Sequence, residues 1–312
     1  MPDPFADPVL GPDAANLANP GSLGRIGVTG LSGYLGQRLG SAVRAAGYQL
    51  VDLGRGSGVD LAEPSTLAAA VSALRPDAII HAAAANPGRP EASFDASNRA
   101  APAALARTAA SLGIRLVHVS TDSVFNGTVF DGTVFHGRAG PYPDGAPVSP
   151  INHYGETKAA GEAAVLAAHP GAVSVRTSLI YGLHEPDRGT AEFVRRLRAG
   201  QPVRLFVDAI RQPVWVEALS AGLVRLATEL ASVHGVINLA GSQALDRAAF
   251  ARRMLRYWGV SEEVLSGPLV ADVRASEVST SVPLDLRLEL RRAGELGLDC
   301  PGVDEVLARH PR

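Results

Sequence analysis

The sequence RIGVTGLSGYLG occupies residues 25–36 and joins a short apolar run to three regularly spaced glycines. The run at 25–29 predicts a buried β-strand, and residues 35–46 predict a helix. Glycines at a strand-to-helix turn permit a tight turn, let backbone N–H groups approach a pyrophosphate, and let the helix pack closely. The stretch therefore predicts a dinucleotide-binding turn at residues 30–36.

Strands and helices are expected to alternate after this turn. The predicted strands are 48–53, 78–81, 116–119 and 173–177, and the predicted helices are 67–74, 98–112 and 154–168. Such alternation is typical of a parallel sheet with helices on both faces. We therefore predict an α/β fold, a Rossmann-type doubly wound parallel sheet with a smaller C-terminal lobe.

The chain divides into three expected regions. Residues 1–24 are rich in proline and predict a flexible N-terminal tail, because they lack the basic segment and apolar core of a signal peptide. Residues 25–181 predict the dinucleotide-binding domain, with a segment near 205–240 returning to the sheet. Residues 182–312, where charge increases, predict mainly a substrate-binding lobe.

Composition excludes several classes of function. The 312 residues are 46% apolar, which is enough for a large core, and the net charge of −2 disfavours nucleic acids and anionic membrane surfaces. A run of about 18 apolar residues, which a membrane span needs, is missing from the sequence. The single cysteine, Cys300, cannot form an internal disulfide, so a cytoplasmic protein is expected.

The only lysine stands in a distinctive position. Of the 29 basic residues, 28 are arginine and one is Lys158, four residues after Tyr154. On a helix this spacing places both side chains on one face. A cation beside a phenol is expected to lower the tyrosine pKa and to favour proton transfer to a carbonyl oxygen. The alternative is an incidental helical pair.

A hydroxyl donor is expected at the end of the strand 116–119. Ser120, Thr121 and Ser123 all qualify chemically, because ligands of parallel sheets collect at the carboxyl ends of strands. Spacing alone does not choose among the three.

The second strand bears on the choice of dinucleotide. A small residue followed by arginine, here Gly54 and Arg55, makes room for a 2′-phosphate and favours NADP(H) over NAD(H). Asp52 could instead accept a hydrogen bond from a ribose 2′-OH. Asp60 and Leu61 could contact the adenine edge, or Asp60 could cap the helix that follows.

These motifs together resemble the extended short-chain dehydrogenase/reductase superfamily, in the branch of the dTDP-4-dehydrorhamnose reductases. The matching stretches are TGLSGYLG at 29–36, RPDAIIHAAA at 75–84, VHVSTDSVFNG at 117–127, YGETKAAGE at 154–162, VRTSLIYG at 175–182 and the weaker RQPVWV at 211–216. The resemblance implies an NADP(H)-dependent reduction of a keto group on a nucleotide-linked deoxysugar.

The resemblance also implies roles for individual residues. Thr121 would bind the carbonyl, Tyr154 would be the acid, and Lys158 would contact both the tyrosine and the nicotinamide ribose. The implied cofactor-binding residues are Gly30, Ser32, Gly33, Tyr34, Leu35, Gly36, Arg55, Asp60, Leu61, Ala82, Ala83, Ala84, Asn98, Ser120 and Thr177. The implied substrate-binding residues are Asn86, Asp122, Ser123, Tyr181 and Trp215, with Ser123 at a position where the branch carries an aromatic residue. No metal site is expected.

Two alternatives remain open at this level. One is a sugar-nucleotide epimerase with the same cofactor. The other is a non-catalytic regulatory subunit similar to the β subunit of methionine adenosyltransferase. A homodimer is compatible with all of these. Three VFxG pentads follow one another from residue 124 to 138, and they predict either a surface hairpin or a flap over the site.

Overall fold

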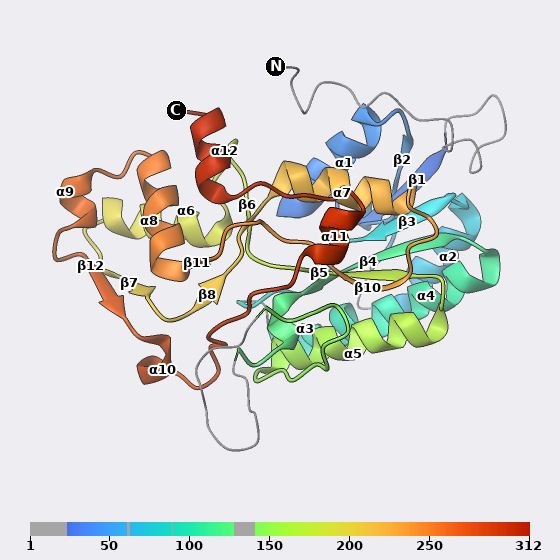
Figure 1. Cartoon of the computed structure of the whole chain (residues 1–312). Coiled ribbons are helices and arrows are strands. Elements are labelled where there is room, and N and C mark those ends of the chain that lie inside the picture. The colour runs from blue at the N-terminus through green and yellow to red at the C-terminus, as the bar shows by residue number, and fades with distance from the viewer. Residues whose placement is uncertain (1–23, 61–62, 89, 128–140) are drawn as a thin grey trace.

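The computed structural model of the chain describes residues 24–60, 63–88, 90–127 and 141–312. A parallel sheet of six strands forms its centre (Figure 1). In spatial order these strands are β10 (Gly235–Asn238), β5 (Val173–Thr177), β4 (Arg115–Thr121), β3 (Ala78–His81), β1 (Arg25–Thr29) and β2 (Gln49–Asp52). The predicted doubly wound sheet is confirmed.

The strand order changes direction beside β1. The chain passes from β1 to β2 on one side and then crosses to β3 on the other, so the direction of winding reverses at this point. In open α/β sheets ligands bind at such a switch point, outside the carboxyl ends of the strands. The glycine turn after β1 therefore lies where a ligand is expected.

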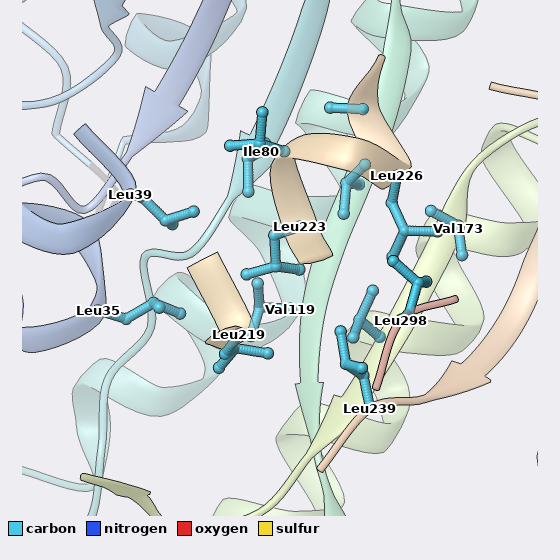
Figure 2. Close-up of a cluster of buried hydrophobic side chains, with 14 of the residues drawn as sticks. Leu35, Leu39, Ile80, Val119, Val173, Leu219, Leu223, Leu226, Leu239 and Leu298 are labelled. Atoms are coloured by element: carbon cyan, nitrogen blue, oxygen red, sulfur yellow. The ribbon is translucent and has the colours of Figure 1, made fainter. Parts of the chain in front are cut away.

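Helices cover both faces of the sheet (Figure 1). One face carries α1 (Tyr34–Ala45) and α7 (Val216–Ala227). The other carries α2 (Pro64–Leu74), α4 (Ala101–Leu112) and α5 (His153–Ala168). Figure 2 shows the core beneath α1 and α7, where Leu35, Leu39, Leu219, Leu223 and Leu226 lie with Ile80, Val119, Val173, Leu239 and Leu298.

Alternation along the strands explains why both faces are buried. Ile79 of β3 packs in the cluster beneath α2 and α4, whereas its neighbour Ile80 packs in the cluster beneath α1 and α7. Both are fully buried, and each such side chain stabilises the fold by about 1.5–3 kcal/mol. The continuous apolar run of β3 is thus what a parallel, doubly covered strand requires.

The remaining elements follow β5 in the chain. They are β6 (Ile180–Tyr181), α6 (Arg188–Arg198), β7 (Val203–Phe206), β8 (Ile210–Arg211), β9 (Val214–Trp215), β11 (Leu245–Asp246), α8 (Arg247–Tyr257), α9 (Glu262–Leu265), β12 (Val270–Val273), α10 (Ala275–Val278), α11 (Arg291–Glu295) and α12 (Val303–Arg309). One group of them encloses a separate apolar cluster around Leu205, Leu255 and Leu265, whereas Ala293 of α11 packs in the main core. The division at residue 181 remains a prediction.

Several boundaries differ from the sequence-based expectation. The helix predicted at 98–112 begins only at Ala101, after a short helix α3 (Ala92–Phe94) and a π-helical turn η3 (Asp95–Ala100). Short 3₁₀ turns η2 (Arg55–Ser57) and η4 (Asp122–Val124) follow β2 and β4. Residues 1–23 of the expected N-terminal tail, Leu61 and most of the VFxG repeat lie outside the described residues. Within the described part of the chain, no helix is both long and apolar enough to cross a bilayer.

Candidate active site

The glycine turn is shaped by two close approaches. Gly30 has a φ of 78° and would bring a Cβ within 2.9 Å of the backbone of Ala83. A Cβ at Gly36 would collide with the carbonyl oxygen of Gly30. Helix α1 therefore begins directly over the turn, and no acidic residue stands in its first turn. Free N–H groups at a helix start favour a phosphate, so the turn fits the pyrophosphate of a dinucleotide.

The loop after β3 forms the facing wall of this turn. The N–H of Ala83 donates to Thr29 Oγ1 at 3.1 Å. Asn98 in the π-helical turn η3 holds the same loop, because its Oδ1 accepts from Ala85 N at 2.8 Å and its Nδ2 donates to Ala85 O at 2.9 Å. Of the predicted residues, Ala82 and Ala83 thus lie against the glycine turn, and Asn98 contacts this loop.

Helix α5 presents its functional side chains on one face. Tyr154, Lys158 and Glu162 are spaced by four residues, and Lys158 and Glu162 are buried. The helix begins at the cap of Asn152, whose Oδ1 accepts from Gly155 N at 2.9 Å. A Cβ at Gly155 would collide with the carbonyl oxygen of Ser123. This glycine therefore lets the first turn of α5 approach the end of β4 closely.

Lys158 is held by the strand beneath it. Its ammonium is only 2% exposed and donates to the carbonyl oxygen of Val119 at 2.7 Å. Burial lowers the pKa of Lys158 to about 8, an effect that the Glu162 carboxylate opposes. Glu162 itself pairs with Arg176 at 2.6 Å. Lys158 therefore carries most of its charge at neutral pH but loses it in mildly alkaline solution.

Tyr154 does not have the acidity expected from the sequence. Burial raises the pKa of its phenol to about 12, although a hydrogen bond with the Thr121 side chain acts in the opposite direction. The expectation that Lys158 lowers the pKa of Tyr154 is therefore wrong. Desolvation disfavours the phenolate, and the ammonium is directed to the Val119 carbonyl. At neutral pH Tyr154 holds its proton, and its hydroxyl donates to Asn86 Oδ1 at 3.5 Å.

The three candidate hydroxyls after β4 occupy different positions. Ser120 is 3% exposed, and among the described residues its Oγ has no hydrogen-bond partner. Thr121 is half-buried, donates to Asp122 Oδ1 at 3.2 Å and interacts with Tyr154. Ser123 is half-buried and its hydroxyl also donates to Asp122, at 3.3 Å. Thr121 is thus the hydroxyl that contacts the phenol.

Asp122 lies behind these hydroxyls as a buried carboxylate. Ser178 Oγ donates to its Oδ2 at 2.7 Å, and Arg211 Nε lies 3.9 Å from the same oxygen. Burial raises the pKa of Asp122, while Arg211 and the three hydroxyl groups lower it. With only 4% of Asp122 exposed, its carboxylate faces protein groups and orients Thr121. A direct contact of Asp122 with substrate is not supported by this placement.

Two aromatic residues predicted to bind substrate make no contact with Thr121, Asp122 or Tyr154 among the interactions of the described residues. Tyr181 is fully buried and packs edge-on against Phe250, with ring centroids 5.6 Å apart. Trp215 is half-buried and its ring lies 5.1 Å from that of His310. Tyr181 therefore fills an apolar cluster, and a role in lining the substrate site is not supported for it.

The residues predicted around the adenosine lie near the surface. Arg55 is exposed in η2 directly after β2. The Asp52 carboxylate also lies over this turn, since a Cβ at Gly54 would be 2.9 Å from its Oδ1. Asp60 is exposed, and its backbone N–H is bonded to Thr66 Oγ1 at 2.9 Å. A cation and a carboxylate therefore both stand at the end of β2.

A polar row that the sequence did not predict crosses the sheet beside Lys158. Thr29, His81, His118 and Ser174 are direct neighbours on β1, β3, β4 and β5. Thr29 Oγ1 and His81 Nδ1 are 2.8 Å apart, and the two imidazole rings stack at 5.4 Å. Burial and the Lys158 charge lower the pKa of His81 to about 3, and lower that of His118 well below its usual value. Both rings are therefore neutral at physiological pH.

Further residues at the site were missed in the sequence. Arg188 at the start of α6 donates to the carbonyl oxygen of Pro87 at 3.2 Å and so spans from α6 to the loop after β3. Arg211 lies 3.9 Å from the Asp122 carboxylate, and the charge of Asp122 also acts on Arg247. Arginine is the commonest charged residue of this chain, so its identity alone gave no signal for these three. Across the described residues, no group of three His, Cys, Asp or Glu side chains is arranged to hold a metal ion.

Comparison with known proteins assigns this arrangement to a family. The model of the RmlD substrate binding domain matches residues 24–285. The chain is 34% identical over 246 residues to a dTDP-4-dehydrorhamnose reductase of Mycobacterium tuberculosis, which covers 77% of each protein. It is 28% identical over 299 residues to a dTDP-4-dehydrorhamnose reductase of Sinorhizobium fredii, covering 91% of this chain and 96% of that protein.

A further relative and a solved structure agree with this. A dTDP-4-keto-6-deoxy-D-glucose reductase of Streptomyces niveus is 35% identical over 219 residues, covering 67% of this chain and 71% of that protein. The crystal structure of a dTDP-4-dehydrorhamnose reductase from Bacillus anthracis, in complex with NADP, superposes with a TM-score of 0.78 at 24% identity, covering 92% of this chain and 98% of that one. This last likeness concerns the fold. The resemblance seen in the sequence is confirmed, and the chain belongs to the RmlD substrate binding domain family.

Proposed function

We propose that the protein reduces the keto group of a nucleotide-linked deoxysugar and that NADPH is its preferred reductant. The relatives are named as reductases of dTDP-linked keto sugars. The observation that carries the proposal is the contact between Thr121 and a protonated Tyr154 at the carboxyl end of β4, on the same edge of the parallel sheet as the glycine turn.

NADPH bound at residues 30–36 would supply a hydride to the carbonyl carbon. Thr121 would turn its hydroxyl proton from Asp122 to the carbonyl oxygen of the bound substrate, and Tyr154 would give its proton to the alkoxide that forms. The high pKa of Tyr154 keeps the phenol protonated before reaction, which suits an acid. Lys158 uses one of its three donors on Val119, and the other two would hold the ribose hydroxyls of the cofactor.

Tyr154→Phe tests this role, with Tyr48→Phe as the matched control at the opposite end of the sheet. Tyr48 directly precedes β2 and lies against Gly24. Loss of the proton donor is expected to lower kcat by about 10²- to 10⁴-fold in assays with a dTDP-linked 4-keto sugar. Tyr48→Phe is expected to keep normal activity. Undiminished reduction by Tyr154→Phe would overturn the proposal.

The preference for NADPH rests on Arg55, an exposed cation directly after β2. A guanidinium there favours a 2′-phosphate, whereas the neighbouring Asp52 favours a ribose 2′-OH. Arg55→Ala is expected to raise the KM for NADPH about tenfold and to leave that for NADH almost unchanged. Asp52→Asn is expected to raise the KM for NADH instead. Equal effects of Arg55→Ala on both cofactors would contradict the preference.

Stoichiometry separates a reductase from an epimerase. A reductase oxidises one NADPH for each sugar reduced, whereas an epimerase returns its hydride and consumes none. The regulatory-subunit alternative is disfavoured, because the relatives are named as reductases of dTDP-linked keto sugars. We further propose a homodimer in the cytoplasm, which light scattering of the purified protein and cell fractionation would test.

A further inference from the structure

Segment 182–188 joins β6 to the start of α6 and reaches across the carboxyl edge of the sheet. β6 begins shortly after β5 ends. In the strand order β5-β4-β3-β1 the segment therefore starts beside β5, and it contacts Tyr34, which begins α1 directly after the glycine turn that follows β1. Neighbouring strands are about 4.8 Å apart, so three spacings, or about 14 Å, separate β5 from β1. The segment thus spans the two strands that lie between them.

The phenol of Tyr34 makes the contact at α1. Its hydroxyl donates to the carbonyl oxygen of Glu185 at 3.0 Å. A Cβ at Gly182 would lie 2.8 Å from the Tyr34 hydroxyl oxygen, so the glycine lets the phenol lie against the segment. Burial raises the pKa of Tyr34, and nearby carboxylates, first that of Asp187, act in the same direction. The phenol therefore keeps the proton that it donates to the segment.

Arg188 links the other end of the segment to the loop after β3. Its Nη1 donates to the carbonyl oxygen of Pro87 at 3.2 Å. The next residue, Gly88, has a φ of 91°, and a Cβ there would lie 2.8 Å from Arg188 Nη2. Both the backbone conformation and the space therefore favour glycine beside the guanidinium. The same loop contacts Gly30 through Ala83, so the segment is linked to both walls of the dinucleotide-binding turn.

Two further contacts of the segment are of less consequence for its position. His184 Nε2 lies 3.6 Å from Glu217 Oε1 at the start of α7, but the imidazole is 68% exposed, and such surface pairs contribute little. The Asp187 carboxylate accepts from Gly189 N at 3.0 Å and so caps α6, which is a contact within the segment's own helix. The position of the segment over the turn therefore depends mainly on the hydrogen bonds of Tyr34 and Arg188.

We propose that Tyr34 and Arg188 are positioning residues that hold segment 182–188 across the bound dinucleotide and slow its release. The inference rests on the proposed function, in which NADPH extends from the glycine turn to Tyr154. Its pyrophosphate would lie at the start of α1, where Tyr34 stands, and its nicotinamide would lie towards the end of β4. The dinucleotide and the segment thus run along the same edge of the sheet, so the cofactor leaves only when the segment moves away.

Stopped-flow measurement of NADPH release tests the inference without turnover. NADPH bound to the full-length protein is displaced by an excess of NADP⁺, and the fluorescence of NADPH is followed. Tyr34→Phe, which removes only the hydroxyl, and Arg188→Gln are each expected to raise the dissociation rate constant about 2- to 10-fold, because one hydrogen bond is lost. The double variant should release NADPH faster than either single variant. The matched controls, Tyr48→Phe and Arg198→Gln at the exposed end of α6, should release it like the wild type.

A shorter ligand separates this role from a general disturbance of the glycine turn. 2′,5′-ADP carries the adenosine and the 2′-phosphate but neither the pyrophosphate nor the nicotinamide, so it does not extend beneath the segment. Isothermal titration should give the same affinity for 2′,5′-ADP in the wild type, Tyr34→Phe and Arg188→Gln. Arg188→Lys, which keeps a donor, should bring NADPH release back towards the wild-type rate. A loss of affinity for 2′,5′-ADP as large as that for NADPH would contradict the inference.

The same measurements distinguish failure of the inference from failure of the proposed function. If the wild type binds NADPH, and Tyr34→Phe, Arg188→Gln and the double variant all release it at the wild-type rate, the inference is overturned and the proposed function stands. If the wild type binds neither NADPH nor NADH, the proposed function is overturned together with the inference.

Discussion

At the scale of single residues, the chemistry depends on two groups whose pKa values move in opposite senses. Burial raises the pKa of Tyr154 to about 12 and lowers that of Lys158 to about 8. The phenol is therefore protonated over the whole physiological range, which favours reduction over oxidation. The ammonium is the group that titrates near neutral pH, so the pH dependence of the reaction should follow Lys158.

This assignment predicts an alkaline limit to activity. As pH rises through about 8, Lys158 loses its charge, and kcat for reduction is expected to fall with an apparent pKa near this value. Lys158→Arg should move the fall to higher pH, because a guanidinium stays charged. Initial rates from pH 6 to pH 10 would measure this. A wild-type profile that stays flat to pH 9.5 would contradict the assignment.

The neutral histidine pair predicts sensitivity to acid. The pKa of His81 is about 3 in the folded protein, against about 6.5 when unfolded, so the unfolded chain binds more protons between these values. The neutral histidines therefore make their full contribution to the free energy of unfolding above pH 6.5. Below that pH the free energy of unfolding falls by about 1.4 kcal/mol per pH unit for each histidine. Urea unfolding at pH 7 and pH 5 would measure the loss. His118→Phe should remove roughly half of this loss. If the free energy of unfolding of the variant falls with pH as steeply as that of the wild type, His118 is not a source of the acid sensitivity.

At the scale of elements, two glycines of α5 set the distance between the helix and its neighbours. A Cβ at Gly155 would collide with Ser123 O, and a Cβ at Gly161 would collide with Asn98 O. Both contacts are with backbone, which cannot rotate away as a side chain can. The glycines in YGETKAAGE therefore position Tyr154 and Lys158 relative to β4 and η3.

Gly155→Ala is accordingly expected to displace Tyr154 from Thr121. A fall in kcat/KM of at least about tenfold is expected, because small displacements of a catalytic group are costly. Overpacking should also lower the free energy of unfolding by about 1–3 kcal/mol. Gly145→Ala is the control, since nothing lies within 4 Å of the added methyl group. Normal kinetics of Gly155→Ala would show that the close contact is not required.

The elements differ in how far the sequence could predict them. The strands 78–81 and 173–177 were predicted with their observed bounds, because their apolar runs are short and clearly interrupted. The π-helical turn that contains Asn98 was not predicted, since no residue pattern distinguishes it from an α-helix. The position of Arg247 depends on the pairing of β11 with β8, which joins residues about 35 positions apart and leaves no local signal.

At the scale of the whole molecule, Asp122 connects the catalytic strand with the C-terminal elements. Its carboxylate accepts from Ser178 after β5 and lies 3.9 Å from Arg211 of β8. Arg211 donates to the carbonyl oxygens of Pro283 and Leu284, so segments from distant parts of the sequence meet there. The orientation of Thr121 therefore depends on contacts that only the complete fold provides.

Asp122→Asn tests this connection, because it removes the carboxylate that Arg211 and Arg247 share. Leaving buried cations without a counter-charge is expected to lower the free energy of unfolding by about 3–5 kcal/mol. Asp304→Asn breaks the solvent-exposed pair with Arg253 and should cost under about 1 kcal/mol. Urea unfolding of both variants at pH 7 would make the comparison. Similar losses in the two variants would mean that Asp122 acts as an ordinary surface carboxylate. A much larger loss in Asp122→Asn would show that the stability of the site and the stability of the fold depend on the same buried charge.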